Sequence, residues 1–137
     1  MQPAPELQRI VEGFYDAFSR ADAAGIDALL SRQDGVLFIG TDPDEWWADY
    51  ASLARAFKAQ LQELSGARLQ AGDPVAWREG SVGWAADRGT LHLPDGTALP
   101  FRLTAVFHAE GDAWKLVQGH TSFGVPNEEA VGKELPV

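Results

Sequence analysis

Polar and aromatic side chains recur at every second position near the end of the chain. The row comprises Trp114, Leu116, Gln118, His120 and Ser122. Because side chains alternate between the two faces of a strand, we expect these five to share one face. A face that combines indole, amide, imidazole and hydroxyl groups is typical of a ligand pocket with a few convergent polar groups. Alternatively, the row faces a second copy of the chain, with His120 hydrogen-bonded to it.

Two side chains are candidate general bases. His120 is one, because histidine is the side chain that titrates near neutral pH. Asp87 is the other, since its strand face otherwise carries small residues that leave volume for a ligand. These small residues are Gly83, Ala85 and Gly89. The large aromatic side chains of a helix would fill the same volume equally well. The side chains that would polarise a carbonyl beside such a base are Tyr50, Gln118 and Ser122.

The segment from Leu99 to Ala109 alternates between an apolar face and a mixed face. The apolar face, which would form core or pocket wall, carries Phe101, Leu103, Ala105 and Phe107. The mixed face, which would be an outer surface covered by a partner subunit, carries Arg102, Thr104, Val106 and His108. If the mixed face instead points inward, Arg102 would clamp a carboxylate with two parallel hydrogen bonds.

Two tryptophans complete the set of predicted ligand contacts. Trp84 would lie on a strand, and Trp47 would edge either the pocket or the seam between two subunits. The full predicted set is Trp47, Tyr50, Trp84, Arg102, Phe107, Gln118, His120 and Ser122. We expect no metal and no cofactor, because the three histidines lack zinc-type spacing and no nucleotide-binding motif is present.

Helices must come first to position these groups. Apolar residues at helical spacing predict a helix from Pro5 to Arg20, and Asp22 would cap a shorter helix that ends near Leu30. The residues from Gly35 to Gly40 are too few for anything but a strand. Asp42 as N-cap, with Pro43 at the next position and Glu45 reaching back, predicts that a third helix begins at Asp42. Its buried stripe would be Trp46, Tyr50, Leu53, Phe57, Leu61 and Leu64.

Extended segments follow the helices. Four strands are predicted at about 68–78, 82–93, 99–109 and 113–123, separated by turn residues. Antiparallel strands this long twist and curl enough to form a concave face that helices can cover. Helices followed by strands indicate the α+β class, with a tail from Gly124 to Val137 that wraps over a neighbour or frays.

Composition narrows the class of protein. A chain of 137 residues is the size of one domain, so we expect a single domain spanning 1–137. The net charge of −9 repels nucleic acid and anionic membrane surfaces. The start of the chain resembles no secretory signal and no stretch is long enough to cross a bilayer, so we expect a cytoplasmic protein.

Three segments resemble the SnoaL-like branch of the nuclear transport factor 2-like superfamily. They are residues 39–47 (IGTDPDEWW), 102–107 (RLTAVF) and 114–122 (WKLVQGHTS). The resemblance implies a cone-shaped α+β domain in which three N-terminal helices pack on a strongly curved antiparallel sheet. It also implies a pocket between sheet and helices, and a homodimer formed through the outer sheet face.

Members of this superfamily include isomerases, polyketide cyclases, dehydratases, epoxide hydrolases, kinase association domains and transport factors, so the fold alone does not assign an activity. Isomerase-like members carry an Asp base near the position of Thr41 and Asp42, but here Asp42 is better explained as a helix cap. Cyclases of the SnoaL type use an acid near the last strand, whereas the segment from Trp114 to Phe123 has none.

The leading hypothesis is a protein that binds a small, largely apolar ligand in the cone. Whether it is an enzyme stays open at this point. One alternative is an isomerase, cyclase or dehydratase with Asp87 or His120 as general base. Another is a non-catalytic dimerisation module.

Overall fold

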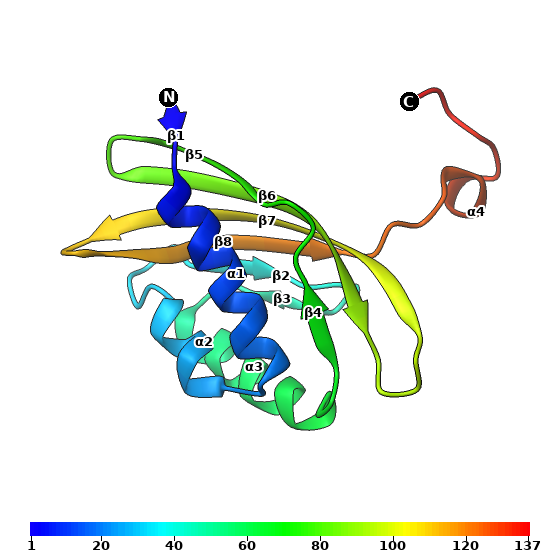
Figure 1. Ribbon diagram of the computed structural model, residues 1–137, viewed down its shortest axis with the longest axis horizontal. Coiled ribbons are helices and arrows are strands. Elements are labelled where there is room, and N and C mark those ends of the chain that lie inside the picture. Colours follow the sequence, from blue (N-terminus) through cyan, green and yellow to red (C-terminus); the bar gives the residue numbers. More distant parts are fainter.

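Helices cover the concave face of a curled, open β-sheet in the computed structural model, which describes residues 1–137 (Figure 1). The helices are α1 (Pro5–Ser19), α2 (Ala23–Leu29), α3 (Tyr50–Glu63) and α4 (Asn127–Val131). The first three lie against the sheet, whereas α4 stands apart at the end of the chain (Figure 1). The predicted α+β cone is therefore confirmed.

Eight strands form a single sheet. They are β1 (Gln2–Pro3), β2 (Leu37–Ile39), β3 (Trp46–Trp47), β4 (Arg68–Gln70), β5 (Val75–Glu79), β6 (Val82–His92), β7 (Ala98–Glu110) and β8 (Ala113–Ser122). Their order is β1-β5-β6-β7-β8-β2-β3, with β4 also paired to β6. Only β2 and β8 run parallel, and every other pair is antiparallel. The face opposite the helices is called the outer face below.

The first helix contributes most to the core. Proline at its first position suits a helix start, and its apolar stripe buries Leu7, Val11 and Phe14. Asp22 caps α2 by accepting a hydrogen bond from the backbone N–H of Gly25 at 2.9 Å. Both helices lie within a residue of their predicted limits.

The third helix begins later than predicted. Glu45 does reach back to the backbone N–H of Asp42, at 3.1 Å, but these contacts close the hairpin between β2 and β3. The pairing of Phe38 with Trp47 keeps the chain extended there, and the helix starts only after Asp49 accepts from the N–H of Ser52. Trp46 is consequently 61% exposed, so its predicted place in the core is wrong.

The predicted strand from residue 68 to residue 78 is broken in two. Between β4 and β5, the backbone N–H groups of Gly72 and Asp73 donate to the side-chain carboxylate of Asp87 on β6 instead of to a backbone carbonyl of that strand. Gly72 is required at this position, because a side chain there would collide with the backbone of Arg88. The gap opens the outer face beside the middle of β6.

The last strand changes face partway along its length. The register against β7 shifts between Val106 and Phe107, so Leu116 lies opposite Phe107 while Gln118 lies opposite Val106. One extra residue of this kind turns the following side chains to the other face. Leu116 is buried in the core, whereas Gln118, His120 and Ser122 lie on the outer face. The prediction that all five side chains share one face is therefore wrong.

The residues after β8 leave the body of the domain. Residues 124–137, called the C-terminal arm below, are all exposed and include the single turn of α4 (Figure 1). None of the helices combines the length and the apolar character needed to cross a membrane.

Candidate functional site

A cavity of about 90 Å³ lies between α3, the β2–β3 hairpin and the ends of β4, β6, β7 and β8. Nine hydrophobic side chains form most of its wall, and we call it the mouth cavity. The aromatic members are Phe18, Phe38, Trp47, Phe57, Phe101 and Phe123. Phe38 holds the wall together, with its ring centre 5.3 Å from that of Phe57 and 6.4 Å from that of Trp47.

One carboxylate is fixed at this wall. Glu45 accepts a hydrogen bond from the side-chain amide of Gln60 at 3.1 Å and from the backbone N–H of Asp42 at 3.1 Å. Gly40 allows this approach, because any side chain on it would collide with Glu45. The remaining polar lining comes from Thr41 and Thr121. The mouth cavity thus offers an apolar ring of side chains and a hydrogen-bond acceptor with one defined position.

The inner end of the cone is filled. A void of only about 10 Å³ remains there, lined by nine hydrophobic residues of α1, α2 and the sheet. Leu7 occupies the space beside Gly83, and Tyr15 packs beside Gly89. Side chains of α1 therefore fill the volume above the small residues of β6. The sequence had suggested either a ligand or the aromatic side chains of α3 for this volume, and side chains of α1 occupy it instead.

The predicted ligand contacts do not meet in one place. Trp47 lines the mouth cavity, and Phe107 is buried at the inner end of the cone. Tyr50 donates a hydrogen bond from its hydroxyl to Asp27 at 2.6 Å, and this hydrogen bond raises the pKa of Tyr50. The guanidinium of Arg32 lies 4.5 Å from the centre of the Tyr50 ring. Tyr50 therefore joins α3 to α2 and is not part of the cavity wall. The predicted contacts that lie on the outer face are Trp84, Arg102, Gln118, His120 and Ser122.

The two predicted bases lie on opposite faces of the sheet. Asp87 is buried, and its two oxygens accept hydrogen bonds from Asp73 at 3.0 Å and Gly72 at 3.1 Å. The buried hydroxyl of Tyr15 lies near this carboxylate without a hydrogen-bond partner. Burial, and then the charge of Asp87, raise the pKa of Tyr15 well above its ordinary value, so its phenol stays protonated. His120 is exposed on the outer face.

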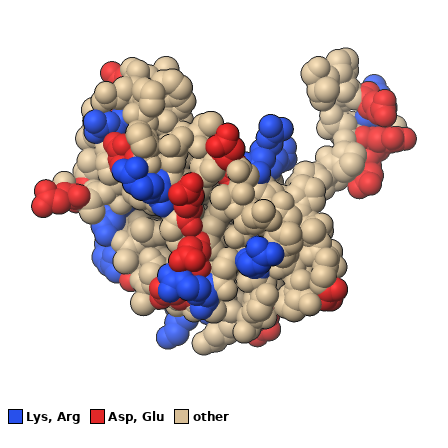
Figure 2. Space-filling view, viewed as in Figure 1, with Lys and Arg blue, Asp and Glu red and all other residues tan.

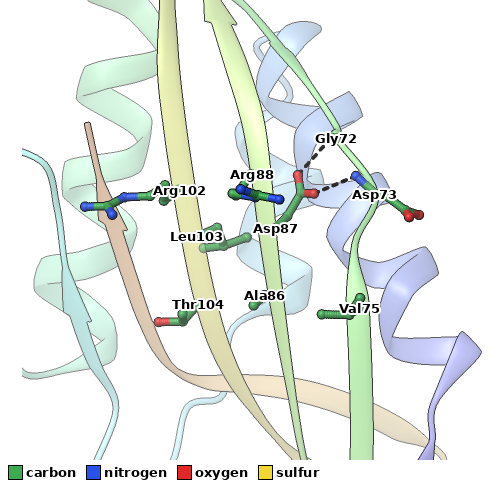
Figure 3. Close-up of a pocket in the computed structure, with 9 residues that line it drawn as sticks. All are labelled: Gly72, Asp73, Val75, Ala86, Asp87, Arg88, Arg102, Leu103 and Thr104. Atoms are coloured by element: carbon green, nitrogen blue, oxygen red, sulfur yellow. Dashed lines mark hydrogen bonds between the residues drawn. The ribbon is translucent and has the colours of Figure 1, made fainter. Parts of the chain in front are cut away.

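A second hollow, of about 830 Å³, opens on the outer face where the gap between β4 and β5 exposes β6 and β7 (Figure 3). Arg88 and Arg102 stand at its rim on neighbouring strands, and we call it the arginine groove. Nowhere in the structure do three His, Asp or Glu side chains converge as a metal site would require.

Sequence reasoning missed the polar residues of the mouth cavity. Glu45 was interpreted as part of a helix cap, which hid its position on the cavity wall. Gln60 lies one residue from the predicted apolar stripe of α3 and looked like a surface residue. The one available signal was Gly40, since a glycine before a sharp hairpin often allows a close approach.

Comparison with known proteins places the chain in a defined structural group. The model of the SnoaL-like domain matches residues 7–126. An NTF2-like protein of unknown function from Pseudomonas putida superposes with a TM-score of 0.81 at 15% identity, covering 96% of this chain and 92% of its own. A proposed dehydratase of the NTF2-like family from Streptomyces avermitilis gives 0.78 at 15% identity, covering 87% and 94%.

Among curated proteins, Cell division control protein 15 of Schizosaccharomyces pombe is 36% identical over 64 residues. That match covers 47% of this chain and 7% of the yeast protein, so the chain spans only a small part of that relative.

Proposed function

Because the chain belongs to the SnoaL-like domain family, we propose that it binds a small, largely apolar molecule in the mouth cavity. The observation that carries this proposal is the aromatic wall of the cavity together with the fixed carboxylate of Glu45. Pockets of this kind bind a ligand through apolar contact and orient it through a few polar groups.

The size and polarity of the cavity support a proposal for the class of ligand. At about 90 Å³ the cavity is far below the roughly 300–1,000 Å³ of sites for drug-sized molecules. We therefore expect a ligand of about one ring, or a larger molecule that inserts one end. The ligand would carry a hydroxyl or N–H group, because the carboxylate of Glu45 accepts hydrogen bonds and repels other acceptors.

Thermal unfolding with a panel of single-ring alcohols, phenols and the matching hydrocarbons tests the proposal. A compound at 100 times its dissociation constant should stabilise the protein by about 2.7 kcal/mol. Glu45→Gln should weaken the binding of the phenols more than that of the hydrocarbons, because a charged acceptor gives the stronger hydrogen bond. Glu63→Gln, on the exposed side of α3, is the matched control. If no compound binds, or if both variants bind as the parent does, the proposal is wrong.

A second candidate function is catalysis of an isomerase, cyclase or dehydratase reaction in the same cavity. The position of Glu45 favours it, since a carboxylate held at an apolar wall is suited to remove a proton from a bound ligand. In this proposal Glu45 takes the role that the sequence had suggested for Asp87 or His120. The structural similarity to a proposed dehydratase is consistent with this chemistry but reflects the fold alone.

Proton exchange separates catalysis from binding. A ligand with an acidic C–H bond next to a carbonyl should lose that proton to D₂O in the presence of the protein, as followed by NMR. Glu45→Gln should abolish the exchange while the ligand still binds, because the amide keeps the shape but cannot accept the proton. If exchange is absent in the parent protein although the ligand binds, binding is the function and catalysis is excluded for that ligand.

A further inference from the structure

Two arginines lie on neighbouring strands of the outer face without any acidic partner. Arg88 on β6 and Arg102 on β7 are directly opposite in the sheet, and both are exposed. Arg102 donates to the hydroxyl of Ser122 at 3.1 Å, and neither arginine forms an ion pair. Like charges at such positions destabilise a sheet. The chain has a net charge of −9, yet these two arginines form no ion pair and lie beside a groove of about 830 Å³. This arrangement suggests that acidic groups of another molecule or segment bind there.

An apolar patch adjoins the arginine groove. Trp77 is 42% exposed and lies opposite Trp84, which in turn lies opposite Val106. Val75, which is 52% exposed, lies between this row and the arginines and lines the groove. Contiguous apolar surface of this kind marks a contact with another molecule. The outer face is therefore complementary to a partner that is acidic at one end and apolar at the other.

The C-terminal arm has this composition. It carries Glu128, Glu129 and Glu134 against the single positive charge of Lys133. Figure 2 shows the charged side chains of the arm gathered away from the body of the domain. The apolar side chains of Val131 and Leu135 are 59% and 46% exposed.

The helical turn of the arm is too short to be stable by itself, because a helix of fewer than about 12 residues is marginal in water without packing. Its one helical turn, Asn127–Val131, buries no residue. The turn would gain its stability from packing on a surface that it does not contact in the single copy.

From these observations we infer that the C-terminal arm of one copy binds in the arginine groove of a second copy. Glu128 and Glu129 pair with Arg88 and Arg102 of the other copy. The apolar residues of the arm cover the apolar patch around Trp77 and Trp84. The arm starts beside Ser122, in the same cross-strand row as the two arginines. Its fourteen residues reach about 46 Å when extended, enough to cross the outer face of a neighbour. A two-fold axis would bury both arms at once. This inference does not depend on the mouth cavity.

Charge reversal tests the pairing. We compare the full-length protein with an arginine variant, Arg88→Glu with Arg102→Glu, and an arm variant, Glu128→Arg with Glu129→Arg, by sedimentation at micromolar concentration. The parent should be a dimer that dissociates as salt is raised. Either variant alone should dimerise about tenfold more weakly or not at all. Arg9→Glu with Arg55→Glu, at two exposed helix positions, is the matched control and should remain dimeric.

Mixing the two variants distinguishes exchange between copies from folding of the arm onto its own domain. In a mixed dimer, the acidic arm of the arginine variant meets intact arginines, and the basic arm of the arm variant meets introduced glutamates. A heterodimer should therefore form from two variants that are each monomeric. If they stay monomeric when mixed, or if the parent is a monomer, or if each variant alone dimerises like the parent, the inference is overturned. Circular dichroism checks folding, and Arg88→Gln with Arg102→Gln replaces the arginine variant if that variant does not fold.

Discussion

Asp87 is a buried acid that holds two segments of the sheet together. Its carboxylate accepts two backbone hydrogen bonds at the gap between β4 and β5, and it is not part of the wall of the mouth cavity. This geometry favours a structural role over the catalytic one that the sequence suggested. Its neighbour Asp73 lies at the same gap but is exposed, and its side chain forms no hydrogen bond.

The pair gives a direct prediction. Asp87→Asn should lower the free energy of unfolding by about 2 kcal/mol, because the amide has one acceptor oxygen and turns an N–H donor toward another donor. Asp73→Asn should change it by less than about 0.5 kcal/mol, as most surface substitutions do. Urea unfolding at neutral pH measures both. Equal stability of the two variants would contradict the structural role of Asp87.

At the level of single residues, alternation along a strand predicted the face of each side chain correctly wherever the register was continuous. It correctly separated the buried and exposed faces of β6 and β7, including Asp87 and Arg102. It failed on β8, where one extra residue moved Gln118 and His120 to the outer face. A shift of this kind depends on the pairing with β7, which local sequence does not encode.

At the level of elements, α1 and α2 could be predicted because their caps and apolar stripes agree. The start of α3 could not, since the contacts between Asp42 and Glu45 serve a helix cap and a hairpin turn equally well. The tertiary pairing of β2 with β3 decided between the two. The observed N-cap, Asp49, is as suitable a capping residue as Asp42. The prediction placed the start of the helix earlier because Trp46 fits the apolar stripe.

Asp49 should make the stability of α3 depend on pH. The hydrogen bond from the N–H of Ser52 lowers the pKa of the Asp49 carboxyl in the folded state. A lowered folded pKa means that the stabilisation is complete above the ordinary pKa of aspartate and is lost as pH falls through the lowered value. Asp49→Ala should therefore reduce the Tm at pH 7, and its difference from the parent should shrink as the pH falls through the lowered pKa of Asp49.

Two further variants sharpen this test by calorimetry. Asp49→Asn should have a Tm close to that of the parent at pH 7, because asparagine is an equally good N-cap that does not titrate. Asp44→Ala, an exposed position in the preceding turn whose side chain accepts no hydrogen bond, should leave the pH dependence unchanged. A difference between Asp49→Ala and the parent that stays constant with pH would show that the carboxylate does not act as the cap.

At the level of the whole molecule, the curled sheet followed from the length and order of the predicted strands. The small size of the remaining cavity did not, because it depends on how deeply Leu7 and Tyr15 of α1 enter the cone. The proximity of Arg88 and Arg102 also arises only from strand pairing, since the two residues are fourteen positions apart in the chain. Sequence therefore predicted the architecture, while packing and register determined the two hollows.

The strong negative charge should also control the response of the fold to salt. At pH 7 the net charge of −9 makes the compact chain repel itself, and salt screens this repulsion over a Debye length of about 10 Å at 0.1 M. The free energy of unfolding in urea should therefore rise between about 20 and about 200 mM NaCl. Contacts between the C-terminal arm and a second copy would weaken over the same range, but they depend on protein concentration, whereas self-repulsion does not. Repeating the unfolding at two protein concentrations separates the two effects.

The dependence on pH gives a second check of the role of net charge. Near pH 4.6, the isoelectric point, the net charge vanishes, so the rise of the unfolding free energy with salt should vanish as well. A concentration-independent fall in stability with salt at pH 7 would instead mean that surface ion pairs such as Arg32–Asp27 outweigh the repulsion.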